Sequence, residues 1–172
     1  MGPVSAEIEI DVPRAEAFEA IADLARRPSF TDHFQTGFHL TRIESAGVGA
    51  GARFRAGPRR REVWMDTAIE EVDAPHKLVE RGRGGRANRI AATTVWELLE
   101  GPGGLTRVSV SHWTEPAKFI DRVLEVASGA AGWQERRWRE ALRRLRDVLE
   151  SDETPPEPVA VAGGNRHETG IP

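Results

Sequence analysis

The stretch AKFIDRVLEVASGAAGWQERRWREALRRLRDVLE, residues 117–150, decides how this chain folds. Apolar residues recur along it at intervals of three and four, the spacing that places side chains on one face of an α-helix. The members of this stripe are Ile120, Val123, Leu124, Ala127, Ala131, Trp138, Leu142, Leu145 and Leu149. One long amphipathic helix is therefore predicted here, with its apolar stripe against a core.

The predicted helix is not uniform along its length. Its second half carries Glu and Arg residues four apart, such as Glu140 and Arg144, which support a solvent-facing side. Its middle, ASGAAG at 127–132, has only small residues, and each Gly weakens a helix by about 1 kcal/mol relative to Ala. We therefore expect the helix either to bend at this point or to cover a cavity.

Short strands precede the helix. Residues 4–12 alternate between apolar and polar, which indicates a strand with one buried face. A helix is predicted over 14–26 and a second short helix or turn over 29–34. Six more strands, separated by turns rich in Gly and Pro, are predicted at 38–44, 52–56, 61–72, 77–83, 89–99 and 106–113. The predicted class is α+β, with a curved antiparallel seven-stranded sheet around one long C-terminal helix and two short helices after the first strand.

The composition of the chain excludes several kinds of site. There are no cysteines among the 172 residues, so disulfides, zinc–thiolate sites and a Cys nucleophile are excluded. The net charge is −3, and segment 151–172 holds four acidic residues against one Arg. Residues 1–150 therefore balance at 23 basic and 23 acidic residues, which gives no overall field for nucleic acid, and no nucleic-acid partner is expected.

The domain organisation and location follow from similar patterns. Residues 1–150 are predicted to form one domain, and 151–172, rich in Pro and Gly without apolar periodicity, a disordered tail. The opening MGPVSAEIEI lacks the basic and apolar regions of a signal peptide, and no apolar run approaches the roughly 20 residues of a membrane span. We expect a cytoplasmic protein without integral membrane association, as a monomer or a weak dimer.

Three stretches resemble a known superfamily. They are EIEIDVPRAEAFEAIADLARRPSF at 7–30, VWMDTAIEEVDAPHKLVER at 63–81 and TTVWELLEGPGGLTRVSVSH at 93–112. Together with the order of elements, they resemble the START-like SRPBCC superfamily, specifically its polyketide cyclase/dehydrase-like branch, over about residues 4–150. The resemblance implies a helix-grip fold whose cavity, between sheet and long helix, holds hydrophobic small molecules. It implies no catalytic residues, because the superfamily shares none.

Nucleotide, cofactor and metal motifs are weak or lacking. The strings at 47–52 and 82–87 fit the pattern G-x-G-x-x-A, but both lead into strands rather than into the helix that a dinucleotide loop requires. They are predicted to be hairpin turns. The five His residues have no metal-ligand spacing. Neither a cofactor nor a metal is therefore expected.

The candidate ligand-binding residues come from strand alternation and from the helix stripe. His112 has the parity of Val108 and Val110 and is expected to face the interior, either as an acid/base or ligand hydrogen-bond partner or as a His satisfied by the backbone or water. The predicted lining residues are Met65, Val110, His112, Val123, Ala127 and Ala130. Trp64 and Trp96 are each expected to line the pocket or to plug it.

Arginines gather around two turns that a meander places at one end of the sheet. The candidates for the rim of the cavity are Arg53, Arg55, Arg59, Arg81, Arg83 and Arg86. In proteins that this one resembles, this end is the usual mouth of the cavity. The arginines are interpreted as a site for an anionic head group, as a docking patch for an anionic surface, or as ordinary solvated hairpin tips. A nucleic-acid site is the least favoured interpretation, because the turns lack interleaved aromatic residues.

Three functional hypotheses follow. The first is the binding of a hydrophobic small molecule, lipid or polyketide-like, neutral or acidic. The second is a polyketide cyclase or dehydratase, a lyase or isomerase in which His112 and Arg81 handle protons or an enolate. The third is a protein-interaction module whose cavity is filled by side chains and whose basic rim or tail meets a partner protein. Trp133 is interpreted either as its anchor or as a cap on the core.

Overall fold

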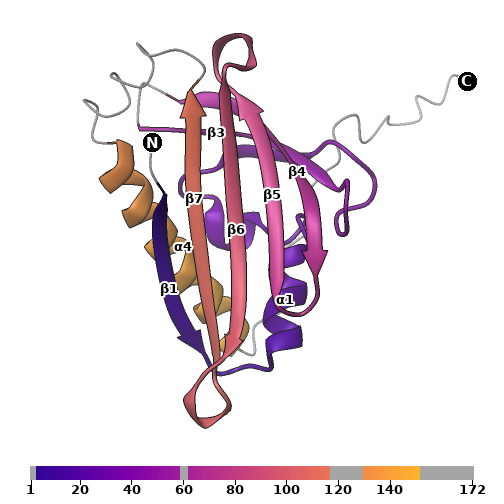
Figure 1. Cartoon of the computed structure of the whole chain (residues 1–172), viewed down its shortest axis with the longest axis vertical. Coiled ribbons are helices and arrows are strands. Elements are labelled where there is room, and N and C mark those ends of the chain that lie inside the picture. The colour runs from indigo at the N-terminus through magenta and orange to yellow at the C-terminus, as the bar shows by residue number, and fades with distance from the viewer. Residues whose placement is uncertain (1–2, 59–61, 117–129, 152–172) are drawn as a thin grey trace, which may run out of the picture.

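The computed structural model describes residues 3–58, 62–116 and 130–151 (Figure 1). The strands are β1 (Val4–Ile10), β2 (Thr36–Leu40), β3 (Gly51–Ala56), β4 (Val63–Asp73), β5 (Lys77–Gly84), β6 (Ile90–Glu100) and β7 (Thr106–Pro116). The helices are α1 (Arg14–Ala22), α2 (Pro28–Thr31) and α4 (Ala130–Glu150), with 3₁₀ turns η1 (Arg86–Asn88) and η2 (Pro102–Gly104). The predicted α+β helix-grip class is confirmed. The helix predicted over 117–129 and the tail predicted over 152–172 lie outside the described residues.

All seven strands form one antiparallel sheet in the order β1-β7-β6-β5-β4-β3-β2. In Figure 1 the strands stand in front of α4, which crosses behind β1 and β7. Side chains alternate between the two faces, so Trp96 and Leu98 of β6 are buried on the helix side while Glu97 is exposed. The face covered by α4 is called the concave face below, and the opposite face is called the outer face. None of the described helices is long and apolar enough to cross a membrane.

Several boundaries differ from the sequence-based expectation by a few residues, and two of the differences have clear local reasons. The first helix ends at Ala22 rather than near residue 26, because Asp23 is extended and its carboxylate accepts a hydrogen bond from the Ala25 amide at 3.0 Å. The second strand occupies Thr36–Leu40 rather than 38–44. The chain beyond Thr41 leaves the sheet, and the Ser45 carbonyl accepts a hydrogen bond from the Leu24 amide at 2.8 Å.

Aromatic side chains join α4 to the concave face. The ring of Trp138 packs edge-to-face on Trp96 at 5.5 Å and on Phe34 at 5.1 Å. Trp96 is 0 % exposed, so it fills the interior, whereas Trp64 is 46 % exposed on the outer face. Filling the interior is one of the two roles expected of Trp96. The expectation that Trp64 lines or plugs a pocket is wrong, because alternation along β4 turns Met65 to the concave face and Trp64 to the outer face.

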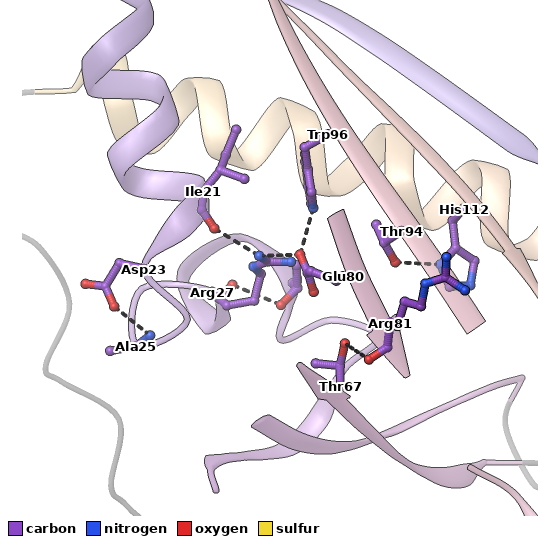
Figure 2. Close-up of polar contacts among 11 residues, drawn as sticks. Ile21, Asp23, Ala25, Arg27, Thr67, Glu80, Arg81, Thr94, Trp96 and His112 are labelled. Atoms are coloured by element: carbon purple, nitrogen blue, oxygen red, sulfur yellow. Dashed lines mark hydrogen bonds and ion pairs between the residues drawn. The ribbon is translucent and has the colours of Figure 1, made fainter. Parts of the chain in front are cut away.

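A buried ion pair connects the helical segment after β1 to the centre of the sheet (Figure 2). Arg27, only 2 % exposed, donates from Nη2 to Glu80 Oε1 at 2.8 Å and to the Ile21 carbonyl at 2.9 Å. The indole N–H of Trp96 donates to the same Glu80 oxygen at 2.9 Å. The Arg27 guanidinium also lies 5.1 Å from the centre of the Trp96 ring. Each buried charge is thus hydrogen-bonded, which is the condition for tolerating it in a core.

Glu80→Gln is expected to lower the free energy of unfolding by about 3–5 kcal/mol, because it leaves the Arg27 charge buried without a counter-ion. Urea unfolding at neutral pH measures this. The matched control is Glu71→Gln, which breaks the exposed 2.9 Å pair with Lys77 and is expected to cost about 0–1 kcal/mol. Adding Arg27→Met to Glu80→Gln should restore part of the loss. Equal, small losses in the two single variants would show that the buried pair is not a major constraint.

Candidate functional site

A row of polar side chains crosses the concave face from strand to strand. In register, His112 of β7 lies opposite Thr94 of β6, and Thr94 lies opposite Glu80 of β5. Val4 and Ile69 end the row at its two sides. Because paired residues point to the same face, all of these side chains belong to the face that α4 covers. Figure 2 shows the three polar side chains above the strands that carry them.

The next row toward the C-terminal end of β7 contains small side chains from β7 to β3 and ends at Leu40 of β2. Its members, in register from β7 to β3, are Thr114, Ala92, Gly82, Thr67 and Ala52. Beyond it lies a second apolar cluster, separate from the main core, that consists of Phe54, Met65 and Ala92 with Phe38, Ala56 and Val63 against them. On one side of the polar row the concave face thus carries large core side chains, and on the other side a row of small ones separates the polar row from Phe54 and Met65.

Gly84 keeps this second cluster close to the sheet. A Cβ atom at Gly84 would lie 2.1 Å from the sulfur of Met65, so Met65 packs directly over the bare backbone of β5. The same Cβ would lie 2.4 Å from the Trp64 carbonyl oxygen, so a larger residue at Gly84 would displace both the Met65 side chain and the backbone of β4. Gly84 thus allows Met65 to pack against the sheet.

His112 borders the small row and makes one polar contact. Its Nδ1 lies 2.9 Å from Thr94 Oγ1, and its ring lies 5.6 Å from that of Trp138. Burial lowers the pKa of His112 to about 4, and the residue as a whole is half-buried. The imidazole is therefore neutral at pH 7. Within the described residues its Nε2 has no hydrogen-bond partner, so this atom can contact a bound molecule as donor or acceptor, depending on the tautomer.

The predicted lining residues lie in different environments in the structure. Val110, 1 % exposed, lies in register with Trp96 within the main core, while Met65 belongs to the second cluster on the same face as His112. Ala130 is the first residue of α4, and its side chain is not described. Val123 and Ala127 lie outside the described residues.

The predicted rim arginines that the structure describes lie on the outer face. The guanidinium carbons of Arg53 and Arg55 each lie 5.6 Å from the centre of the Trp64 ring. Arg53 Nε also contacts Asp66 at 3.2 Å, and Arg83 is exposed in register with Asp66. Their orientation follows from alternation, because Phe54, between Arg53 and Arg55, takes the concave side. Arg59 and the side chain of Arg86 are not described.

His112 and Arg81 are not brought together. Arg81 is exposed and forms an ion pair with Glu70, whereas its chain neighbour Glu80 points to the concave face. The side chains of His112 and Arg81 overlap in the view of Figure 2, but the register places them on opposite faces of the sheet. Among the described residues no three His, Asp or Glu side chains gather in a metal-ligating arrangement.

Sequence reasoning missed Thr94, Arg27 and Glu80. The available signal for Glu80 was its parity with Leu78, which marks an acid among inward-facing positions of a strand. No pattern linked it to Arg27, 53 residues earlier in the chain.

The lowered pKa of His112 predicts how the free energy of unfolding depends on pH. Its pKa falls from 6.5 in the unfolded chain to about 4 in the folded protein, so its neutral form stabilises the fold fully above pH 6.5. As the pH falls from 6.5 toward 4 the unfolded chain takes up the proton first, and stability is lost. Between pH 7 and pH 4.5, wild type should lose about 2 kcal/mol more than His112→Gln. Equal pH slopes, or an imidazole NMR resonance that titrates near 6.5, would contradict the burial of this ring.

The comparisons with known proteins agree with this architecture. A model of the family "Activator of Hsp90 ATPase homolog 1-like protein" matches residues 11–150. The solution structure of the KanY protein is 17% identical with a TM-score of 0.68, over 88% of this chain and 100% of that one. The crystal structure of TTHA0849 from Thermus thermophilus is 18% identical with a TM-score of 0.65, over 87% and 99%.

A third structure, DynU16 from the dynemicin biosynthetic locus, is 21% identical with a TM-score of 0.57, over 90% of this chain and 49% of that one. No curated protein matches the chain significantly. The structural likenesses show the fold, and the family model covers most of the sequence. The chain thus belongs to the family of Activator of Hsp90 ATPase homolog 1-like proteins, within the START-like SRPBCC superfamily that its sequence resembles.

Proposed function

We propose that this protein binds a hydrophobic small molecule, lipid or polyketide-like, between the concave face of the sheet and the C-terminal helix. The observation that carries the proposal is the row of small side chains on the concave face next to the polar row, from Thr114 of β7 to Ala52 of β3. A well-packed core has large and small side chains interdigitated, whereas a continuous row of small ones leaves volume for another molecule. The family is consistent with such a role.

Apolar burial supplies the affinity, at about 25 cal/mol for each Å² of apolar surface removed from water. The polar end of the ligand lies at His112, whose Nε2 is available for one hydrogen bond. Since the imidazole is neutral at pH 7, it contributes a dipole and no charge. A carbonyl or hydroxyl group suits this position, and an acidic group gains a hydrogen bond there without an ion pair.

None of the described rim arginines places a positive charge near His112, where the polar end of the ligand is proposed to lie. Arg53, Arg55, Arg81 and Arg83 extend from the outer face, so the hypothesis of an anionic head group selected by an arginine rim has no support from these four. The proposed site therefore selects a ligand mainly by the size and shape of its apolar part. A single hydrogen-bonding group on the ligand is the second criterion.

Binding is favoured over acid–base catalysis by the state of His112. General acid–base catalysis is most effective when the pKa of the group lies near the working pH. A His with a pKa of about 4 holds no proton to donate as imidazolium at pH 7 and is a weak base. The cyclase or dehydratase hypothesis consequently lacks both of its named groups, because Arg81 lies on the other face.

Ala92→Phe is expected to weaken binding of palmitate or anilinonaphthalenesulfonate at least about tenfold, because the ring fills the space above the small row. The matched control is Ala91→Phe, the preceding residue of β6, which is exposed on the outer face and should stay within about twofold of wild type. Native mass spectrometry gives the stoichiometry, and fluorescence titration gives the affinity.

Two results would oppose the proposal. One is the absence of a one-to-one complex with either probe, which favours an interaction module with a filled interior. The other is an equal effect of Ala91→Phe and Ala92→Phe, which places binding elsewhere on the protein. Near-ultraviolet circular dichroism of both variants shows whether the core remains folded.

A further inference from the structure

A second site lies on the side of α4 that faces away from the sheet. A groove of about 540 Å³ runs between α4 and His33, which lies just after α2. Its lining residues are His33, Trp133, Arg136, Arg137, Arg139, Glu140, Arg143 and Arg144. Five arginines against one glutamate give this groove a strongly positive lining, although residues 1–150 as a whole balance in charge.

Acidic neighbours neutralise only some of these arginines. Arg144 contacts Asp32 at 2.6 Å, and Glu140 contacts both Arg143 at 3.5 Å and Arg144 at 3.4 Å. Arg139 pairs with Glu135 at 2.5 Å. Within the part of the chain that the structure describes, Arg136 and Arg137 have no acidic partner. Among the described groove residues, these two arginines are the ones left without an ion pair.

The other walls of the groove are an aromatic ring and a histidine. Trp133 is partly exposed, and the Arg137 guanidinium carbon lies 5.8 Å from the centre of its ring. His33 Nε2 lies 3.2 Å from the Arg137 carbonyl. Burial, followed by the positive charges of Arg144 and Arg137, lowers the pKa of His33 despite the opposing effects of this hydrogen bond and of Glu140. The lowered pKa is consistent with a positive potential at the groove.

The shape of the charged surface indicates the kind of anion. From Trp133 to Arg144 the lining extends along three turns of α4, or about 16 Å at the rise of an α-helix. An extended peptide of about five residues has this length. Glu140 and Asp32 interrupt the positive run, which disfavours the uniformly charged backbone of a nucleic acid, whereas a peptide alternates charged side chains with neutral amides.

We propose that the groove binds an extended acidic peptide segment of a partner protein. Arg136 and Arg137 pair with carboxylates of the peptide, in the bidentate geometry that guanidinium groups favour, and Trp133 contacts one apolar side chain next to them. This site is independent of the proposed cavity, because it lies on the opposite side of α4 and uses none of the same residues.

The test is the affinity of a fluorescein-labelled peptide of about ten residues, rich in Asp and Glu with one central Leu, followed by fluorescence anisotropy. Arg136→Ser/Arg137→Ser is expected to weaken binding at least about tenfold. The matched control is Arg107→Ser/Arg146→Ser, which removes the same charge from exposed positions outside the groove and should stay within about twofold. Trp133→Ala should weaken a Leu-containing peptide more than one in which Ser replaces the Leu.

Four results would overturn the proposal. The first is no binding of the peptide at low ionic strength, and the second is an equal loss in both double variants, which indicates attraction by net charge alone. The third is tighter binding of a single-stranded oligonucleotide through Arg136 and Arg137. The fourth is a large gain in peptide affinity when the full-length chain carries Asp152→Asn, Glu153→Gln and Glu157→Gln, which assigns the groove to the chain's own acidic segment.

Discussion

The Arg27–Glu80 ion pair is the interaction on which the interior depends. A carboxylate in the middle of a sheet is tolerated only when a counter-charge and further donors reach it. Arg27 supplies the charge from the turn before α2, and the indole of Trp96 supplies a second donor. The position of Trp96 is thereby fixed, and Trp96 packs against Trp138 of α4. The helix α4 is therefore held against the sheet by the contacts from Glu80 to Trp96 and from Trp96 to Trp138.

The same contacts divide the concave face into two halves. On one side of the polar row, Trp96, Leu98 and Val108 fill the space beneath α4. On the other side, the row that includes Gly82 and Ala92 places almost no side-chain volume above the sheet. His112 stands at the border, packed against Trp138 and hydrogen-bonded to Thr94. A ligand bound over this row, as we propose, would meet the second apolar cluster and one neutral imidazole.

The helix α4 has two faces with different chemistry. Its apolar face, with Trp138, Leu142 and Leu145, is buried against the sheet. Its other face carries arginines, and two of them are left without acidic partners within the described residues. Charges on this face remain in water and cost little, whereas a charge in the interior would need a partner like that of Glu80. One helix thus packs an apolar face against the sheet and carries an arginine-lined groove on the other side.

Periodicity in the sequence determined the elements. Seven strands, two short helices and the amphipathic face of α4 follow from alternation and from helical spacing, because burial of one face imposes those periods. Alternation also placed His112 beside Val110 on the inner face. The same alternation, applied to Arg53 and Arg55 on either side of the inward-facing Phe54, indicates that these arginines point outward. The interpretation of the arginines as a rim around the cavity did not take this alternation into account.

Only the tertiary structure decided which residues meet. Trp64 and Trp96 have similar strand contexts, and the register of β4 and β6 against their neighbours buried one and exposed the other. Arg27 reaches Glu80 across 53 residues, and His112 reaches Thr94 across 18. Local patterns specify the face that a side chain occupies, because that depends on backbone geometry within one element. They do not specify its partner, because the partner depends on how separate elements are aligned when the core packs.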